Sequence, residues 1–157
     1  MARQCLLAVR FAVPLFLAVS AARPADLRVD VTNLRSDEGT VHCQLFRSAK
    51  GFPKDTKKAA VVVTAQIKED AAVCEFRDLA AGTYAVAAFH DENGNGRLDR
   101  GFMGMPKEGV AASNDAQGSW GTPSFDKAKL TVGNEETVIV LHMRYLAAAW
   151  QRSRAVQ

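Results

Sequence analysis

The feature that most constrains the fold is a two-residue alternation of apolar and polar side chains, which recurs in seven short runs. Leu27, Val29 and Val31 mark the first run, and the last extends from Thr137 to Tyr145. The five runs between them cover residues 40–46, 59–67, 72–76, 83–90 and about 128–132. Successive side chains of a strand point to opposite faces, so each run predicts a half-buried β-strand.

Turn-forming clusters separate these runs, and seven short strands with regular turns predict an all-β fold. The expected architecture is a seven-stranded immunoglobulin-like or transthyretin-like β-sandwich with one long loop. That long loop, residues 91–124, contains many glycines, and connections of this length in a compact domain are usually functional or disordered. Residues 78–84 resemble a tyrosine corner, in which the Tyr84 hydroxyl bonds to a nearby backbone group.

The N-terminal segment predicts export. Residues 1–22 contain Arg3, an apolar stretch and a run of small residues at 20–22, as in a cleaved secretory signal peptide. An uncleaved anchor is the alternative, although the apolar stretch is short for a membrane span. We therefore expect a β-sandwich domain at 23–145, a C-terminal tail at 146–157 without assigned function, and a periplasmic or secreted protein with no membrane span after cleavage.

Charge argues against nucleic acid as a partner. Loss of Arg3 and Arg10 with the signal lowers the formal net charge from +3 to +1. The remaining sequence has no dense stripe of lysine and arginine interleaved with aromatic residues, which nucleic-acid-binding surfaces usually have. The basic character of the whole chain is therefore mostly a targeting feature.

Two cysteines, Cys43 and Cys74, remain after processing. Each shares the apolar phase of its predicted strand, so both sulfur atoms are expected on the core side. An oxidising compartment then favours a Cys43–Cys74 disulfide, and two separate buried thiols are the alternative.

One motif carries chemistry. Five residues of the turn that follows His90 match ligand positions of an EF-hand calcium loop: Asp91, Asn93, Asn95, Arg97 through its carbonyl, and Asp99. Gly96 falls where such loops need a sharp backbone reversal. Alternate short side chains with oxygen atoms can converge on one hard cation, so the sequence predicts a calcium-binding EF-like loop.

The match to an EF-hand is incomplete. Phe102 stands where the bidentate glutamate belongs, and no flanking helices are apparent. Glu92, Glu108 or Asp115 are candidates for a missing ligand from the folded-back loop. The alternative is a tight metal-free turn built from Asn-Gly and Asp residues.

The segment His90–Asp99, preceded by residues 82–86, resembles the signature of a bacterial exported family known as domain of unknown function 2141. Matching elements follow at residues 104–109, 113–114 and 123–128. The resemblance extends from about Leu27 to Tyr145 and implies an exported fold without an established activity. The chain departs from the family pattern at residues 110–112 and in its tail.

The three histidines give weaker indications of function than the calcium-like loop. His42 and His142 occupy the polar phase of their strands and are expected to face solvent. His90 is placed to orient Asp91 or to cap the loop. Ser113 with His90 and an aspartate could form a triad, but Ser113 lacks a nucleophile-elbow sequence.

The sequence therefore favours an exported, non-enzymatic binding module with no catalytic residues, whose partner is an unknown protein, glycan or small ligand. The alternatives are a hydrolase-type enzyme that uses His90 and loop carboxylates, and a metal-free structural domain. Apolar residues of the long loop, including Phe102, Met103, Trp120 and Phe125, form either a binding surface or a lid over one sheet.

Overall fold

A computed structural model describes residues 24–118 and 122–146. The predicted signal peptide, Trp120 and all but the first residue of the predicted tail lie outside these residues. Eight strands form the described fold: β1 (Ala25–Thr32), β2 (Thr40–Phe46), β3 (Val61–Gln66), β4 (Ala72–Leu79), β5 (Gly82–Asp91), β6 (Val110–Ala112), β7 (Leu130–Val132) and β8 (Thr137–His142). Within the described residues, no helix is long and apolar enough to cross a membrane.

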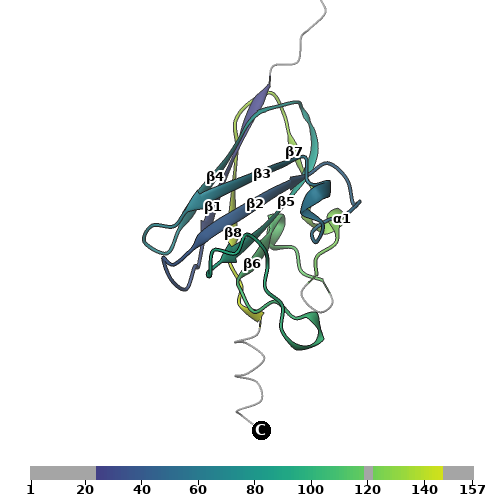
Figure 1. Ribbon diagram of the computed structural model, residues 1–157. Coiled ribbons are helices and arrows are strands. Elements are labelled where there is room, and N and C mark those ends of the chain that lie inside the picture. Colours follow the sequence, from purple (N-terminus) through teal and green to yellow (C-terminus); the bar gives the residue numbers. More distant parts are fainter. Residues whose placement is uncertain (1–23, 119–121, 147–157) are drawn as a thin grey trace, which may run out of the picture.

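The strands form two sheets that pack face to face (Figure 1). The three-stranded sheet has the order β4-β1-β8, and its β1–β8 pair is parallel. The larger sheet has the order β3-β2-β5-β6 and is antiparallel. β7 joins the same edge of β5 as β6, because residues 82–84 pair with β7 and residues 87–89 pair with β6.

The core lies between the sheets, where one phase of each alternating strand is buried. Leu27, Val29 and Val31 of β1 are fully buried, as the alternation predicts. A Cys43–Cys74 disulfide crosses this core with a Cα–Cα distance of 6.4 Å, linking β2 of one sheet to β4 of the other. The predicted pairing is therefore present.

All seven predicted strands are found, and the β-sandwich class is confirmed. The immunoglobulin-like or transthyretin-like assignment stays a prediction. The eighth strand, β6, lies inside the predicted long loop, and the short helix α1 (Phe125–Ala128) overlaps the start of the last predicted internal run. The tyrosine corner is confirmed, since the Tyr84 hydroxyl donates to the Ala80 carbonyl over 2.7 Å.

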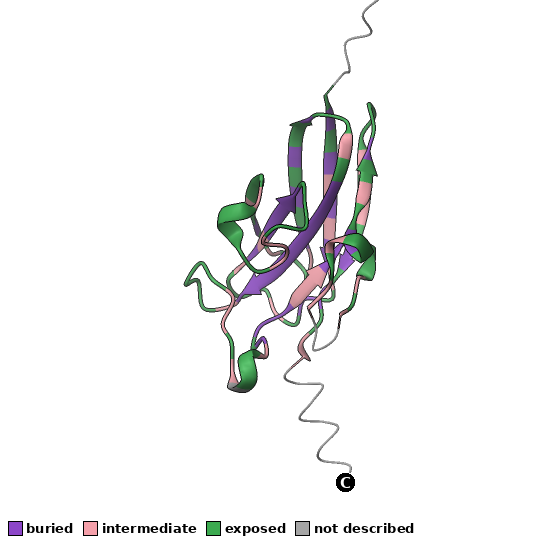
Figure 2. Cartoon of the chain, turned by 90° about the vertical axis from the view of Figure 1, so that its right-hand side faces the viewer, coloured by how far each residue is buried: buried purple, intermediate pink, exposed green. Residues whose placement is uncertain are grey.

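The long loop returns over the outer face of the larger sheet. As a result β5 is buried on both faces along residues 84–91, which Figure 2 shows as a continuous purple strand. Ala85, on the outer face of β5, packs with Ala112 and Ala128 in a second apolar cluster. This arrangement encloses the outer face of β5, whereas Val62 of β3 stays exposed.

Candidate functional site

Asp91, the last residue of β5, closes the turn that follows it. Its carboxylate is 1% exposed and accepts hydrogen bonds from the backbone N–H groups of Asn95, over 3.0 Å, and Gly96, over 2.7 Å. Gly96 has a φ of +75°, a left-handed conformation that glycine adopts without strain. The predicted reversal at Gly96 is therefore present, with the Asp91 carboxylate at its centre.

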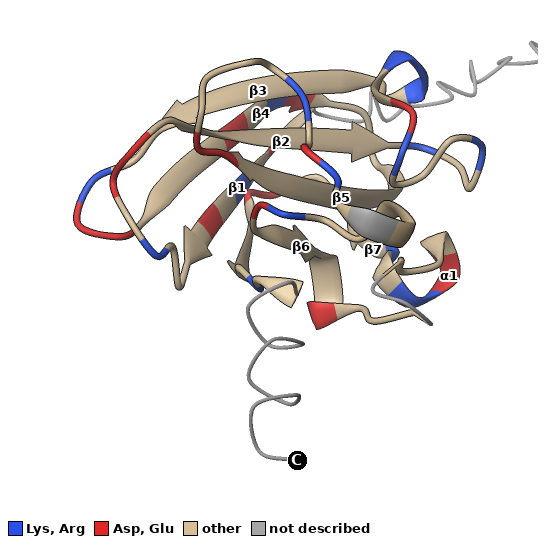
Figure 3. Ribbon diagram, turned by 60° about the horizontal axis from the view of Figure 1, so that its bottom comes forward, with Lys and Arg blue, Asp and Glu red and all other residues tan. Residues whose placement is uncertain are grey.

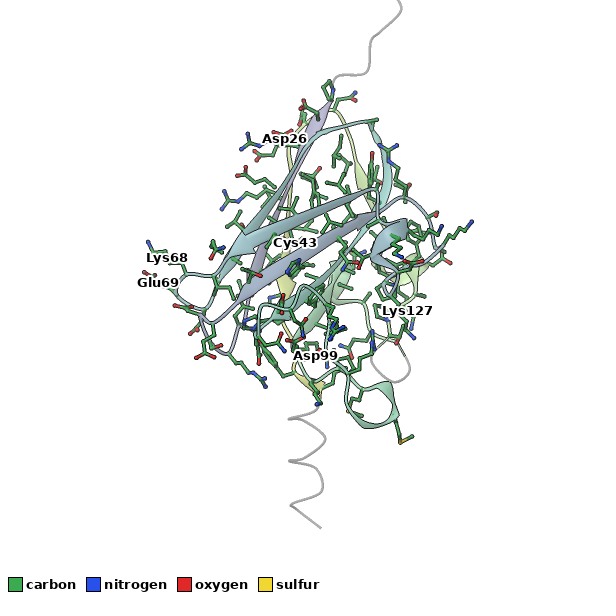
Figure 4. All side chains as sticks on the ribbon, viewed as in Figure 1. Asp26, Cys43, Lys68, Glu69, Asp99 and Lys127 are labelled. Atoms are coloured by element: carbon green, nitrogen blue, oxygen red, sulfur yellow. A yellow bond between two sulfur atoms is a disulfide. The ribbon has the colours of Figure 1, made fainter. Side chains whose placement is uncertain are left out.

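Asp99 gathers two amide side chains from the same turn. The Nδ2 groups of Asn93 and Asn95 donate to its two carboxylate oxygens over 2.8 and 3.0 Å. Figure 4 places Asp99 among the side chains of the long loop. These bonds, that from Asn95 first, hold the pKa of the Asp99 carboxyl below its usual value, so the group is ionised at neutral pH.

Glu108 fastens the far end of the loop to its beginning. Its side chain is buried, and its two oxygens accept from the backbone N–H groups of Glu92, over 3.1 Å, and Asp99, over 2.8 Å. The Lys107 N–H also donates to the Asp99 carbonyl over 2.9 Å. The segment 92–99 is thus held at both ends by one buried carboxylate.

The structure brings together three of the five predicted metal ligands: Asn93, Asn95 and Asp99. Asp91 is directed at backbone N–H groups instead, and the Arg97 N–H donates to Asn95 Oδ1 over 3.0 Å. Rotation of each amide would turn its oxygen toward Asp99, but it would break the bonds that Asn93 Oδ1 and Asn95 Oδ1 now accept from the Asn95 and Arg97 N–H groups. A cation at this point therefore depends on amide oxygens, and no cluster of three His, Cys, Asp or Glu side chains suited to a metal occurs in the described part of the chain.

The three additional ligand candidates have other partners. Glu92 forms a two-point ion pair with Arg35, at 2.7 and 2.5 Å. Asp115 contacts His142 Nδ1 at 3.0 Å, and Glu108 binds backbone as described. The role that these residues have in the structure is therefore to shape the loop and its surroundings.

Among the described residues, the His90 ring forms no hydrogen bond to Asp91. Its fully buried ring bonds to the Glu38 carbonyl through Nε2, over 2.6 Å, and to the Tyr145 hydroxyl through Nδ1, over 2.7 Å. The same hydroxyl accepts from the Arg35 N–H over 3.1 Å. An imidazole protonated at Nε2 satisfies all of these bonds, because the Tyr145 hydroxyl then donates to Nδ1.

The histidine beside Asp91 is His42. Its Nε2 lies 3.3 Å from Asp91 Oδ2, and its ring stacks on Phe89 with centroids 4.8 Å apart. The expectation that His42 faces solvent is wrong, since the side chain is only 17% exposed. Alternation correctly assigned it to the outer face of β2, but the loop covers that face. His142, in contrast, is exposed as expected.

Ser113 has a structural role in the described fold. Its hydroxyl is fully buried, accepts from the Val86 N–H over 2.9 Å and donates to the Ala128 carbonyl over 2.5 Å. Val86 and His90 are four residues apart on one strand, a separation of about 13 Å. The arrangement needed for a Ser113–His90 triad is therefore missing from the described residues.

A cleft of about 350 Å³ lies between the outer face of the larger sheet and the loops around it. Its floor includes Gln44, Ala87 and Phe89 of β2 and β5, and Ala112 of β6. Residues 96–98 and 115–118 of the long loop contribute to its walls. Figure 3 shows acidic and basic positions of this loop in front of β2 and β5.

Gln44 is the cleft residue that sequence reasoning missed. The period-two pattern of β2 places its side chain on the outer face with His42, which usually indicates a solvated position. It is 4% exposed, and the cleft around it is lined by residues 53, 54 and 56 as well as by the returning long loop. No local signal in the strand could have revealed this burial.

The comparisons with known proteins identify a family but no activity. The model of the family described as "Uncharacterized protein conserved in bacteria (DUF2141)" matches residues 29–140. No curated protein and no solved structure matches the chain.

Proposed function

We propose that this chain, which belongs to the bacterial family DUF2141, is an exported, non-enzymatic binding module. In this proposal calcium organises the Asp91–Asp99 turn, and the long loop forms one side of a ligand cleft. The observation that carries this proposal is the cleft of about 350 Å³ over the larger sheet. That volume lies within the usual range for small-molecule sites. Its lining combines apolar residues such as Ala87 and Phe89 with polar and charged side chains, and in small-molecule sites such polar groups fix the orientation of a ligand.

The geometry of the turn supports a structural role for calcium. Asn93, Asn95 and Asp99 already converge, and Gly96 of the same turn also lines the cleft. A cation bound by their oxygens would fix the turn and, through it, the wall at residues 96–98. With Asp99 as the only carboxylate of this group, we expect an affinity in the range of about 10⁻⁴–10⁻³ M.

The disulfide supports export to the periplasm or beyond. Cys43 and Cys74 are fully buried and bonded between the two sheets. Stable structural disulfides occur mainly in oxidising compartments. This agrees with the signal peptide predicted for residues 1–22.

The hydrogen bonds of His90 favour the binding function over the hydrolase alternative, in which His90 would be the catalytic base. Both ring nitrogens of His90 have hydrogen-bond partners, and the ring has no exposure to a substrate. A general base must reach the proton that it removes. His90 instead joins the loop before β2 to Tyr145.

Calcium is expected to stabilise the purified domain, residues 23–157. At 10 mM calcium and the affinity given above, the gain is about 1.4–2.7 kcal/mol, or a rise in Tm of about 5–10 °C. Differential scanning calorimetry with and without EDTA measures this rise. Asp99→Asn should remove most of it, whereas Asp126→Asn, at an exposed carboxylate that pairs with Lys129, should not.

Asn93→Asp separates the calcium loop from a metal-free turn. It places a second carboxylate within hydrogen-bond distance of Asp99, where Asn93 Nδ2 now donates. Without calcium the two charges should repel and lower Tm, and with calcium the added ligand should give a larger rise than in the parent domain. An equal loss of Tm with and without calcium would contradict the calcium proposal.

One observation favours the metal-free alternative. In the structure the two asparagines satisfy Asp99 with amide N–H groups, and Asp91 is satisfied by backbone N–H groups. A turn with these bonds needs no cation to hold its shape. The response of Asn93→Asp to calcium decides between the two.

A further inference from the structure

The side chain of Gln44 is buried at the floor of the cleft with one atom unused. It is 4% exposed, and its Oε1 has no hydrogen-bond partner among the described residues. A buried polar atom without a partner destabilises the folded state. Gln44 Oε1 is therefore an acceptor that is free to bond to a molecule in the cleft.

The surroundings of Gln44 leave room for that molecule. Its neighbour in register on β5 is Ala87, and Ala111 and Ala112 of β6 also line the cleft. The small side chains of these alanines leave space above the sheet, and Phe89 adds an apolar surface to the same cleft. The space suits a compact organic molecule with an apolar body.

Charge restricts the class further. Four cationic residues line the cleft, Lys54, Arg97, Arg100 and Arg144, against one acid, Asp115. Asp115 already pairs with His142, and Arg100 donates to the Gly104 carbonyl. The other three, Lys54, Arg97 and Arg144, are exposed and form no ion pair within the described residues. The cleft therefore carries an excess of positive charge that is free to bind an anion.

We propose that the cleft binds a small organic carboxylate that also carries a hydroxyl or N–H group, with the carboxylate held by Arg97 and Arg144 and the donor bonded to Gln44. This rests on the proposed binding function and names its ligand class. Arginine suits carboxylates because its planar guanidinium can donate two parallel hydrogen bonds. Ala87 and Phe89 pack against the apolar body of the ligand.

The proposal is tested by NMR titration of the ¹⁵N-labelled domain, residues 23–157, with calcium present. The panel contains aliphatic and aromatic hydroxy-carboxylates, 4-hydroxybenzoate among them, the carboxamide of each one, and separate sets of neutral sugars and amines. Carboxylates should shift the signals of Gln44, Ala87 and Arg144. The matching carboxamides should bind at least about tenfold more weakly, because they lack the charge.

Substitutions at the cleft give a second readout. Arg144→Gln should weaken binding of the best carboxylate about tenfold, whereas Lys68→Gln, which Figure 4 places at the tip of the turn between β3 and β4, should leave it unchanged. Gln44→Met keeps the shape of the side chain but removes its polar atoms. It should weaken binding about fivefold while raising Tm of the ligand-free domain by about 3 °C, since an unpartnered polar group is lost.

The opposite signs at Gln44 distinguish a ligand-binding residue from a structural one. A fall in both Tm and affinity in Gln44→Met would overturn its assigned role. Binding of sugars or amines at the cleft in preference to carboxylates would overturn the ligand class and leave the binding function standing. No cleft signal moved by any member of the panel would overturn both.

Discussion

The variant Cys43→Ala/Cys74→Ala is expected to lose about 3–4 kcal/mol of unfolding free energy, because it frees a loop of 31 residues in the unfolded chain. For a domain of this size the loss corresponds to a fall in Tm of about 10–15 °C. Calorimetry of residues 23–157 produced in an oxidising compartment measures it. The bond joins β2 to β4, so its removal also takes away a covalent link between the two sheets.

Alanine is the appropriate replacement at these two positions. Both cysteines are fully buried, and serine would add an unpartnered hydroxyl to the core. Reduction of the parent domain in denaturant, followed by refolding under reducing conditions, is a matched control that keeps both side chains. A double variant that melts within about 2 °C of the oxidised parent would contradict the stabilising role of the disulfide.

Glu108→Ala is expected to cost about 3 kcal/mol, since it leaves two backbone N–H groups, those of Glu92 and Asp99, without their charged acceptor. Tm should fall by about 10 °C. The amide hydrogens of these two residues should exchange faster with solvent, which hydrogen-exchange NMR resolves. The damage should be confined to the long loop, because the disulfide and both sheets keep their contacts.

Two variants control for the loss of charge and for the loss of a surface side chain. Glu108→Gln keeps one acceptor oxygen, so it should cost about half as much as Glu108→Ala. Glu135→Ala removes an exposed glutamate in the turn before β8 and should be nearly neutral. Unchanged exchange at Glu92 and Asp99 in Glu108→Ala would show that this carboxylate does not hold the loop.

Most of the fold could be predicted from alternation alone, because the physical cause is local. A strand with one face on the core repeats its apolar residues every two positions, and β1 with Leu27, Val29 and Val31 does so throughout. β6 was not predicted because it has only three residues, two of them alanine, and forms a strand through its pairing with β5. Its existence is a consequence of where the long loop returns.

The same return explains what was missed in the candidate site. Alternation placed His42 and Gln44 on the outer face of β2, and this is correct. Their burial depends on other segments of the chain, the long loop among them, which no pattern within β2 encodes. Spacing also placed Asp91 with the metal ligands, although in the structure its carboxylate serves the backbone of the turn.

The convergence of Asn93, Asn95 and Asp99 was predictable in part. Alternate short polar residues with a glycine at Gly96 form a turn whose side chains point inward, and this holds with or without a metal. What spacing does not determine is which atom of each amide faces the carboxylate. An amide oxygen would face a bound cation, whereas without a cation the amide N–H donates to the Asp99 carboxylate.

A crystal structure of residues 23–157 grown with 10 mM calcium tests the central proposal most directly. The proposal predicts one ion within about 2.3–2.6 Å of side-chain oxygens from Asn93, Asn95 and Asp99, with both amides rotated so that oxygen replaces nitrogen. Amide nitrogens still bonded to the Asp99 carboxylate, with no ion between them at that concentration, would contradict it.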